Sequence, residues 1–158
     1  MLVTFFATLF LGIEQGIFVG VALSLIVLVF RTSRPHVAEL GKVPNADFYR
    51  NKSRFEEVII EQDVLVFRFD AQIFYANTSY FRDSLDQLVE QKGAALKLIV
   101  LDAESINSID STGIEMLKER VHYYQKKQIT FYFSSVKGPV RDLLFRAGLL
   151  NSIDRTHF

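Results

Sequence analysis

The first thirty residues form an almost unbroken hydrophobic run, whereas the rest of the chain alternates apolar and polar positions. The run contains no Lys or Arg and a single acid, Glu14. One straight helix of this length would be about 45 Å long, but the hydrocarbon core of a bilayer is only about 30 Å thick. Because Gly12 and Gly16 bracket the acid, we expect two short membrane helices, near residues 2–11 and 16–31, packed as a hairpin or broken pair.

The competing interpretation of this run is a cleaved signal peptide, but a basic n-region and a small-residue cleavage site are both missing. Glu14 also has two interpretations. An acid inside a membrane is a functional candidate because its burial is costly, whereas a position between two glycines favours a membrane turn at the headgroups. Arg31, Arg34 and Lys42 follow the run, and the positive-inside tendency then places residues 31–158 in the cytoplasm. The run is too short to form a substrate pathway alone, so it is either a simple anchor or the tail of a larger membrane domain.

Residues 32–56 are predicted to be a linker. Its two prolines disfavour helix and keep the residues before them extended. Val37 and Leu40 are spaced to add an edge strand to the domain that follows, and the polar residues 45–54 predict an exposed loop.

From residue 57 the pattern predicts alternating strands and helices. Runs of β-branched and aromatic residues predict strands at 58–60, 64–69, 97–102 and 129–133, the first two as a hairpin turning at 61–63. Apolar residues at helical spacing predict helices from Phe81 to a stop at Gly93, from about Thr112 to Tyr124, and from Pro139 to Gly148. The nearly continuous run 97–102 suits a central strand buried on both faces. This alternation predicts an α/β fold with a mostly parallel sheet and a mixed edge.

Composition narrows the possible functions. The chain has 18 Lys or Arg and 18 Asp or Glu, and this balance gives no reason to expect a nucleic-acid partner. It has no Cys, and its three His, at 36, 122 and 157, lack metal-ligand spacing. No phosphate-binding Gly-rich loop or nucleophile elbow is present. We therefore expect no enzyme activity, no metal and no cofactor.

The residues Asp110, Ser111, Thr112 and Gly113 connect the strand near 97–102 to the following helix. The simplest interpretation is helix capping, since Asp, Ser and Thr are common caps and Thr112 has capping-box spacing to Glu115. The alternative is that Ser111, exposed at the tip, is phosphorylated or contacts a partner. A phosphate would add about −1.5 to −2 charge at a helix N-terminus, which favours it, although Asp110 would repel it.

Two other groups of residues have alternative interpretations. Asp102 and Asp110 are eight positions apart around a loop; they can converge as an acidic pair, but turn and cap roles are more common for such residues. The aromatic residues Phe74, Tyr75 and Tyr80 follow the strand at 64–69. They are either part of the core and a lid over it or an exposed docking patch.

The strand, Asp110–Gly113 and helix resemble the signature of the STAS domain, which is shared by sulfate-type anion transporters and bacterial anti-sigma-factor antagonists. Three further segments, 12–31, 34–44 and 67–77, resemble the last membrane helices, the linker and the strand-to-helix segment of SulP transporters. The resemblance covers essentially the whole chain. It implies a STAS domain at 57–158, ending short of the last helix that family members usually carry, preceded by membrane helices at 1–31.

By this resemblance, the chain is the C-terminal part of a secondary-active anion transporter, multi-pass in the cell inner membrane, with its STAS domain cytoplasmic. The STAS domain would regulate, assemble or dock partners rather than bind the anion. The implied partners are the rest of the membrane domain, a second copy of the full-length protein and a cytosolic protein. In antagonist relatives the serine matching Ser111 is phosphorylated, so a membrane-tethered phosphoswitch is the alternative.

Overall fold

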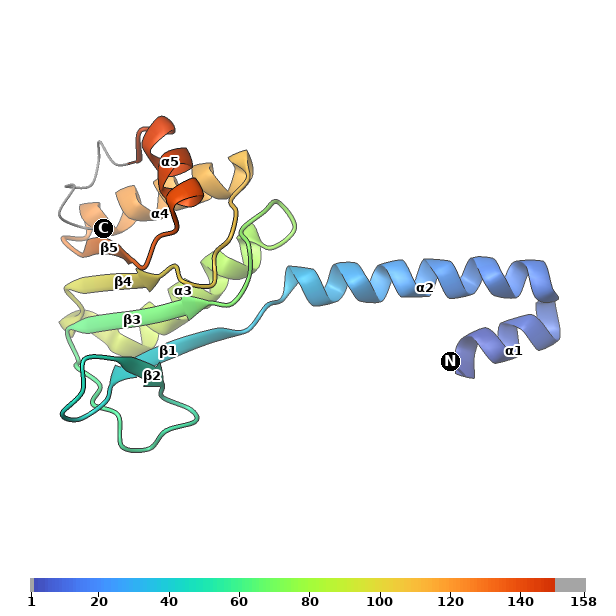
Figure 1. The fold of residues 1–158 in the computed structure, drawn as a ribbon, viewed down its shortest axis with the longest axis horizontal. Coiled ribbons are helices and arrows are strands. Elements are labelled where there is room, and N and C mark those ends of the chain that lie inside the picture. Colours follow the sequence, from blue (N-terminus) through green and yellow to red (C-terminus); the bar gives the residue numbers. More distant parts are fainter. Residues whose placement is uncertain (1, 150–158) are drawn as a thin grey trace. The chain divides into compact units, whose positions relative to one another are not determined.

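The computed structural model describes residues 2–149 and divides the chain into two compact units, with the boundary after Arg34. The first unit is a pair of apolar helices, and the second is an α/β domain (Figure 1). The prediction that the chain ends short of a last helix concerns residues 150–158, which lie outside the described residues.

The first unit contains α1 (Leu2–Leu11) and α2 (Ile13–Ser33), joined at Gly12. Gly12 has φ of 100°, a backbone conformation that favours glycine. In the described part of the chain, α2 alone is long and apolar enough to cross a membrane. It begins at Ile13, so the predicted start at Gly16 is wrong: Gly12 alone makes the turn, and Glu14 lies exposed in the first helical turn, where an acid is favourable.

Small residues let the two helices approach closely. Gly16 is the buried residue of α2, and a Cβ added there would lie 2.7 Å from the Cα of Thr8. One turn further along, a Cβ on Gly20 would lie 3.2 Å from Cγ2 of Thr4. This contact between small residues is the usual way for helices to pack in lipid.

The second unit contains a five-stranded sheet in the order β2-β1-β3-β4-β5 (Figure 1). Its strands are β1 (Val37–Lys42), β2 (Tyr49–Asn51), β3 (Val64–Phe69), β4 (Leu98–Asp102) and β5 (Thr130–Ser134). The pairs β3–β4 and β4–β5 are parallel, whereas β1 is antiparallel to both β2 and β3. The predicted α/β fold with a mixed sheet is confirmed.

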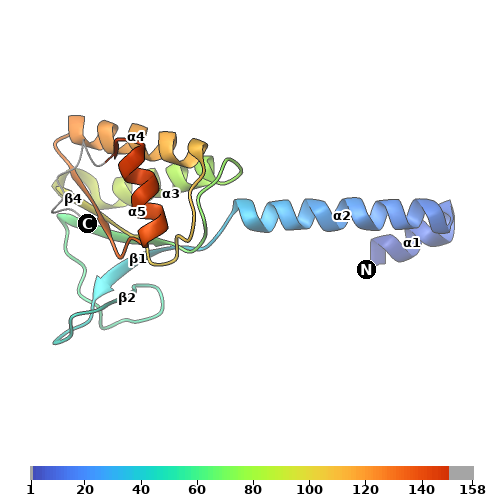
Figure 2. The same cartoon turned by 45° about the horizontal axis from the view of Figure 1, so that its top comes forward.

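Three helices cover one face of this sheet: α3 (Thr78–Lys92), α4 (Ser111–Lys126) and α5 (Gly138–Arg146), with a 3-10 turn, η1 (Gly93–Ala95), after α3 (Figure 2). The core forms between them and alternate strand residues, such as Phe67, Ile99 and Phe131, all at most 1% exposed. Helix α3 stops where Gly93 takes φ of 70°, as its position in the sequence predicted.

Three predicted strand assignments are wrong in detail. Residues 58–60 form no hairpin with β3; Ile59 instead makes a single bridge to Lys42 of β1. Strand β1 lies inside the sheet rather than at its edge, because β2, within the predicted loop 45–54, pairs outside it. Strand β4 is buried on its helix-facing side alone, since its residues alternate between buried and partly exposed.

Candidate functional site

The predicted motif, residues 110–113, lies at the start of α4, where two neighbouring loops from the carboxyl ends of β3 and β4 meet. We call these loops, residues 70–77 and 103–110, the paired loops. Ile73 links them through the backbone. Its N–H donates to the carbonyl of Ser108 at 3.1 Å, and its own carbonyl accepts from the N–H of Asp110 at 3.1 Å. Parallel strands bring their carboxyl ends to one edge of a sheet, so loops 35 positions apart in sequence meet there.

Asp110 holds both loops to the start of α4. Its Oδ1 accepts a hydrogen bond from the N–H of Gly113 at 2.7 Å, and its Oδ2 accepts one from the N–H of Tyr75 at 2.9 Å. Asp110 is therefore the N-cap of α4. The predicted capping box of Thr112 and Glu115 is wrong, because the helix begins at Ser111 and Thr112 lies inside its first turn.

The residues after the cap differ in accessibility. Ser111 and Thr112 are exposed in the first turn of α4, and Gly113 is buried beneath them. A Cβ on Gly113 would lie 2.8 Å from side-chain carbons of both Ile73 and Ile109. The tight contact at Gly113 keeps α4 against the paired loops and leaves the side chain of Ser111 exposed to solvent.

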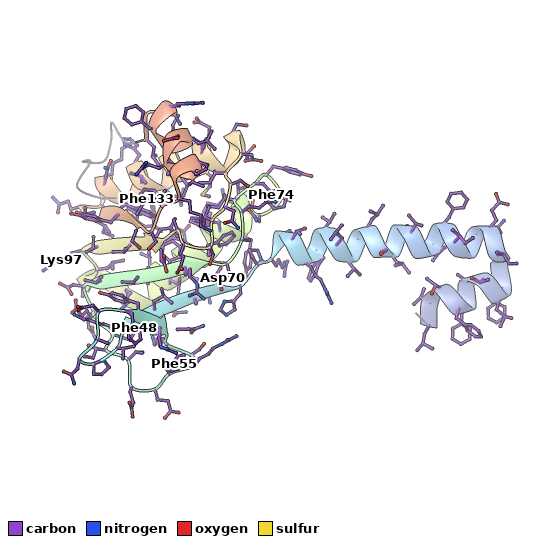
Figure 3. The ribbon with its side chains drawn as sticks, viewed as in Figure 1. Phe48, Phe55, Asp70, Phe74, Lys97 and Phe133 are labelled. Atoms are coloured by element: carbon purple, nitrogen blue, oxygen red, sulfur yellow. The ribbon has the colours of Figure 1, made fainter. Side chains whose placement is uncertain are left out.

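The three aromatic candidates lie in different environments. Tyr75 is 74% exposed at the tip of its loop, Phe74 is partly buried beside it, and Tyr80 is partly buried against the core. Figure 3 labels Phe74 in the loop that follows β3. The rings of Phe74 and Tyr75 meet edge to face with centroids 5.6 Å apart. The structure thus places Tyr75 at the surface beside the N-cap of α4, with Phe74 next to it, and packs Tyr80 against the core.

Asn77, which the sequence interpretation missed, fixes the loop that presents Tyr75. Its buried side chain accepts from the N–H of Phe74 at 3.0 Å and donates to the carbonyl of Gln72 at 2.9 Å. The signal for this role is an Asn just before a helix, which commonly makes such local bonds.

Asp70, at the end of β3 (Figure 3), is a second residue that the sequence interpretation missed. Its carboxylate accepts from Nε of Arg68 at 2.5 Å and from Oγ of Ser105 at 3.2 Å, and it lies 2.9 Å from Nδ1 of His36. Burial acts to raise the pKa of Asp70, but the hydrogen bonds from Arg68 and His36 outweigh it and hold that pKa below its ordinary value. Because Arg68 and Asp70 are two apart on one strand face, their pairing is readable from sequence, whereas the contact of His36, 34 residues away, is not.

Asp102 and Asp110, considered from sequence as an acidic pair, have separate hydrogen-bond partners. Asp102 Oδ1 accepts from the N–H of Glu104 at 3.2 Å in a local turn, whereas Asp110 bonds to Gly113 and Tyr75. Within residues 2–149, no group of three or more His, Cys, Asp or Glu side chains is arranged to hold a metal ion. The paired loops present the exposed side chain of Tyr75 beside the start of α4.

Comparison with known proteins identifies the domain. The model of the STAS domain family matches residues 57–158. The probable sulfate transporter 4.2 of Arabidopsis thaliana is 31% identical to this chain, in a match that covers 99% of this chain and 24% of the relative. The chain spans about a quarter of the length of the curated relatives that it matches.

Solved structures share the fold. The murine Solute Carrier 26 family member A9 anion transporter, in its inward-facing state, matches 99% of this chain and 25% of its own with a TM-score of 0.85 at 23% identity. A sulfate transporter family protein from Wolinella succinogenes matches 68% of this chain and 85% of its own with a TM-score of 0.55 at 17% identity.

The α/β fold and the family match together define a STAS domain protein: the chain belongs to the STAS domain family. Its relatives over the whole length are sulfate transporters, which confirms the predicted resemblance to SulP transporters.

Proposed function

We propose that this chain is the C-terminal part of a secondary-active transporter of sulfate-like anions, in which α2 crosses the membrane and the STAS domain regulates or assembles the transporter. One observation carries the proposal: a 21-residue apolar helix, exposed along nearly its whole length, leads into a STAS domain. Residues of α2 such as Phe18, Ile26 and Phe30 are 58–70% exposed. An apolar surface of this extent suits lipid or further membrane helices rather than water.

The proposal places the anion-binding site outside this chain. Residues 1–30 contain one acid and no base, and the one base of α2, Arg31, lies in its last turn, so the two helices offer little to bind an anion at the midplane. The STAS domain would then act on transport from the cytoplasmic side, through the surface around Ser111 and Tyr75. The partners proposed for it are the remaining membrane domain, a second full-length copy and a cytosolic protein.

The alternative function, a membrane-tethered phosphoswitch, accounts for Ser111 but does not explain the pair of helices α1 and α2. The curated relatives that align along the whole chain are named sulfate transporters, and this supports transport over a tethered antagonist. The same names support transport over catalysis.

The test is transport by the full-length parent protein in proteoliposomes, with labelled sulfate, bicarbonate and a dicarboxylate as substrates. We expect saturable uptake of at least one anion, and a changed rate when residues 57–158 are deleted. A full-length parent that reconstitutes correctly but moves none of these anions would overturn the proposal. Uptake that is unchanged by the deletion would refute the regulatory part alone.

A further inference from the structure

The face of the sheet that α3, α4 and α5 leave uncovered carries apolar side chains in register. Val66 of β3 pairs with Val100 of β4 on one side and with Leu40 of β1 on the other. The neighbouring row pairs Val64 with Leu98. These residues alternate along their strands with the core residues, so they point to the opposite face.

A recess of about 580 Å³ lies on this face. We call it the acidic groove. Its apolar floor is made by Leu40, Phe48, Val64, Val66, Leu98 and Val100. Phe48, labelled near β2 in Figure 3, is 48% exposed at the side of the floor, and the four Val and Leu residues of β3 and β4 are partly exposed. The groove is therefore an accessible apolar surface on a rigid sheet.

Within the described part of the domain, the sheet lacks a covering layer on this face, and this is the physical reason to expect that another element occupies the acidic groove. Sheets made of parallel strands alone are almost always covered on both faces, and three strands of this mixed sheet, β3, β4 and β5, are parallel. Among residues 35–149, the three helices pack into the core on the other face. A helix laid across the exposed apolar rows is the element that completes a layered α/β arrangement.

Charge defines the chemistry of that occupant. Four acids, Asp47, Glu61, Asp102 and Glu104, line the acidic groove, and its lining includes no Lys or Arg. This local excess contrasts with a net charge of zero for the whole chain.

Two cations near the groove are already paired with other acids. Arg68 is bonded to Asp70 at 2.5 Å, and Nζ of Lys92 lies 3.0 Å from the carboxylate of Glu39. Arg68 also attracts Asp102 and Glu104 of the groove, and Lys42 lines a smaller adjoining recess, so part of the negative charge is offset. The four acids of the lining still leave the groove negative above its apolar floor, which attracts positive charge on an approaching partner.

We propose that the acidic groove binds a basic amphipathic helix of another protein, with its apolar side on the β3–β4 rows and its Lys or Arg residues against the four acids. This mode places a helix with one apolar face into a hydrophobic groove. The inference goes beyond the proposed transport function, and peptide binding tests it without any transport measurement.

The experiment uses the 158-residue chain in a non-ionic detergent. Because the chain has no Cys, Ser135→Cys introduces a single site for an environment-sensitive dye at the groove, and Ser79→Cys places the same dye on exposed α3 as a matched control. The probe is a peptide of about 18 residues, roughly five helical turns, with Leu on one face and Lys on the other. A second peptide carries Glu in place of every Lys.

We expect saturable binding of the Lys peptide, reported by the dye at position 135 and not at 79, and no binding of the Glu peptide. Glu61→Gln with Glu104→Gln should weaken binding about threefold to tenfold, as expected for two exposed charge pairs. Glu90→Gln with Asp142→Asn removes two exposed acids elsewhere and should change nothing.

Phe48→Ser tests the apolar floor at an exposed position and should also weaken binding. Equal signals from both dye positions, or equal affinity after the charge removals, would overturn the proposal, because the peptide would then be binding to detergent or to the whole surface. Self-association of the chain that buries the dye at position 135 without peptide would also overturn it, in favour of a second copy of the chain.

Discussion

The double hydrogen bonding of Asp110 predicts a specific loss of stability. Asp110→Ala removes the acceptor for the N–H of Gly113 and the N–H of Tyr75. Loss of an N-cap costs about 1 kcal/mol, and loss of a hydrogen bond to a charged acceptor costs about 1.5 kcal/mol or more. Because Tyr75 is exposed and water replaces part of its bond, we expect a total loss of about 2 kcal/mol.

The assay is urea unfolding of the 158-residue chain in mild detergent, followed by circular dichroism. With a slope of about 1–1.5 kcal/mol/M for a domain of this size, Asp110→Ala should lower the midpoint by about 1.5 M without changing the slope. Asp110→Asn keeps one acceptor oxygen and should lose about half as much. Hydrogen exchange at the Tyr75 amide should rise in both variants.

Thr112→Ala separates the cap seen in the structure from the capping box expected from sequence. As an exposed residue inside the helix, Thr112 should tolerate Ala within about 0.5 kcal/mol. The reasoning is refuted if Thr112→Ala destabilises more than Asp110→Ala, or if Asp110→Ala has no effect on the midpoint.

Four further predictions follow from the structure. Ser111→Asp, but not Ser111→Ala, should change anion uptake by the full-length parent while leaving the unfolding midpoint within about 0.5 kcal/mol; identical uptake by both variants would leave capping geometry as the sole role of this turn. Tyr75→Ser should weaken assembly of the full-length protein with little loss of thermal stability. Tyr80→Ser should destabilise the domain by about 1–3 kcal/mol, because Tyr80 packs against the core. The reverse pattern in scanning calorimetry would contradict the assignment of Tyr75 to the surface and of Tyr80 to the core. The pKa of Asp70 is held below its ordinary value, so its contribution to stability is complete above about pH 5 and is lost as the pH falls through the folded pKa. Asp70→Asn should therefore lose less stability than wild type as the pH falls from about 5 to about 1, and parallel pH curves for the two proteins over this window would exclude this role. Gly16→Leu should separate α1 from α2, because even a Cβ there meets the backbone of Thr8; spin labels on the two helices should report a longer distance, and an unchanged distance would disprove the packing.

The elements with strong hydrophobic periodicity could be predicted from sequence, because their burial follows their own pattern. Strands β3, β4 and β5 and helices α3 and α4 belong to this group, and each was predicted to within a few residues. Strand β2 could not be predicted. Its three residues pair through the backbone of β1, and two of them are exposed, so they leave no apolar pattern.

The candidate site could be predicted in part. Capping chemistry at Asp110–Gly113 was visible, but Thr112 and Asp110 both satisfy cap preferences, and a shift of two residues in the helix start decides between them. The second bond of Asp110, to Tyr75, joins residues 35 positions apart. Only the parallel pairing of β3 with β4 brings them together, and a periodicity argument does not supply that register.

The passage from α2 to β1 has a mechanical consequence. Three residues separate Ser33 from Val37, one of them Pro35, and fully extended they reach at most about 14 Å. His36, the last residue of the connection, is itself held to Asp70 at the end of β3, which shortens the free part of the connection. In any orientation of the two units, this short connection limits the distance between the end of α2 and the start of β1. A displacement of the end of α2 by more than that length must pull on the sheet itself.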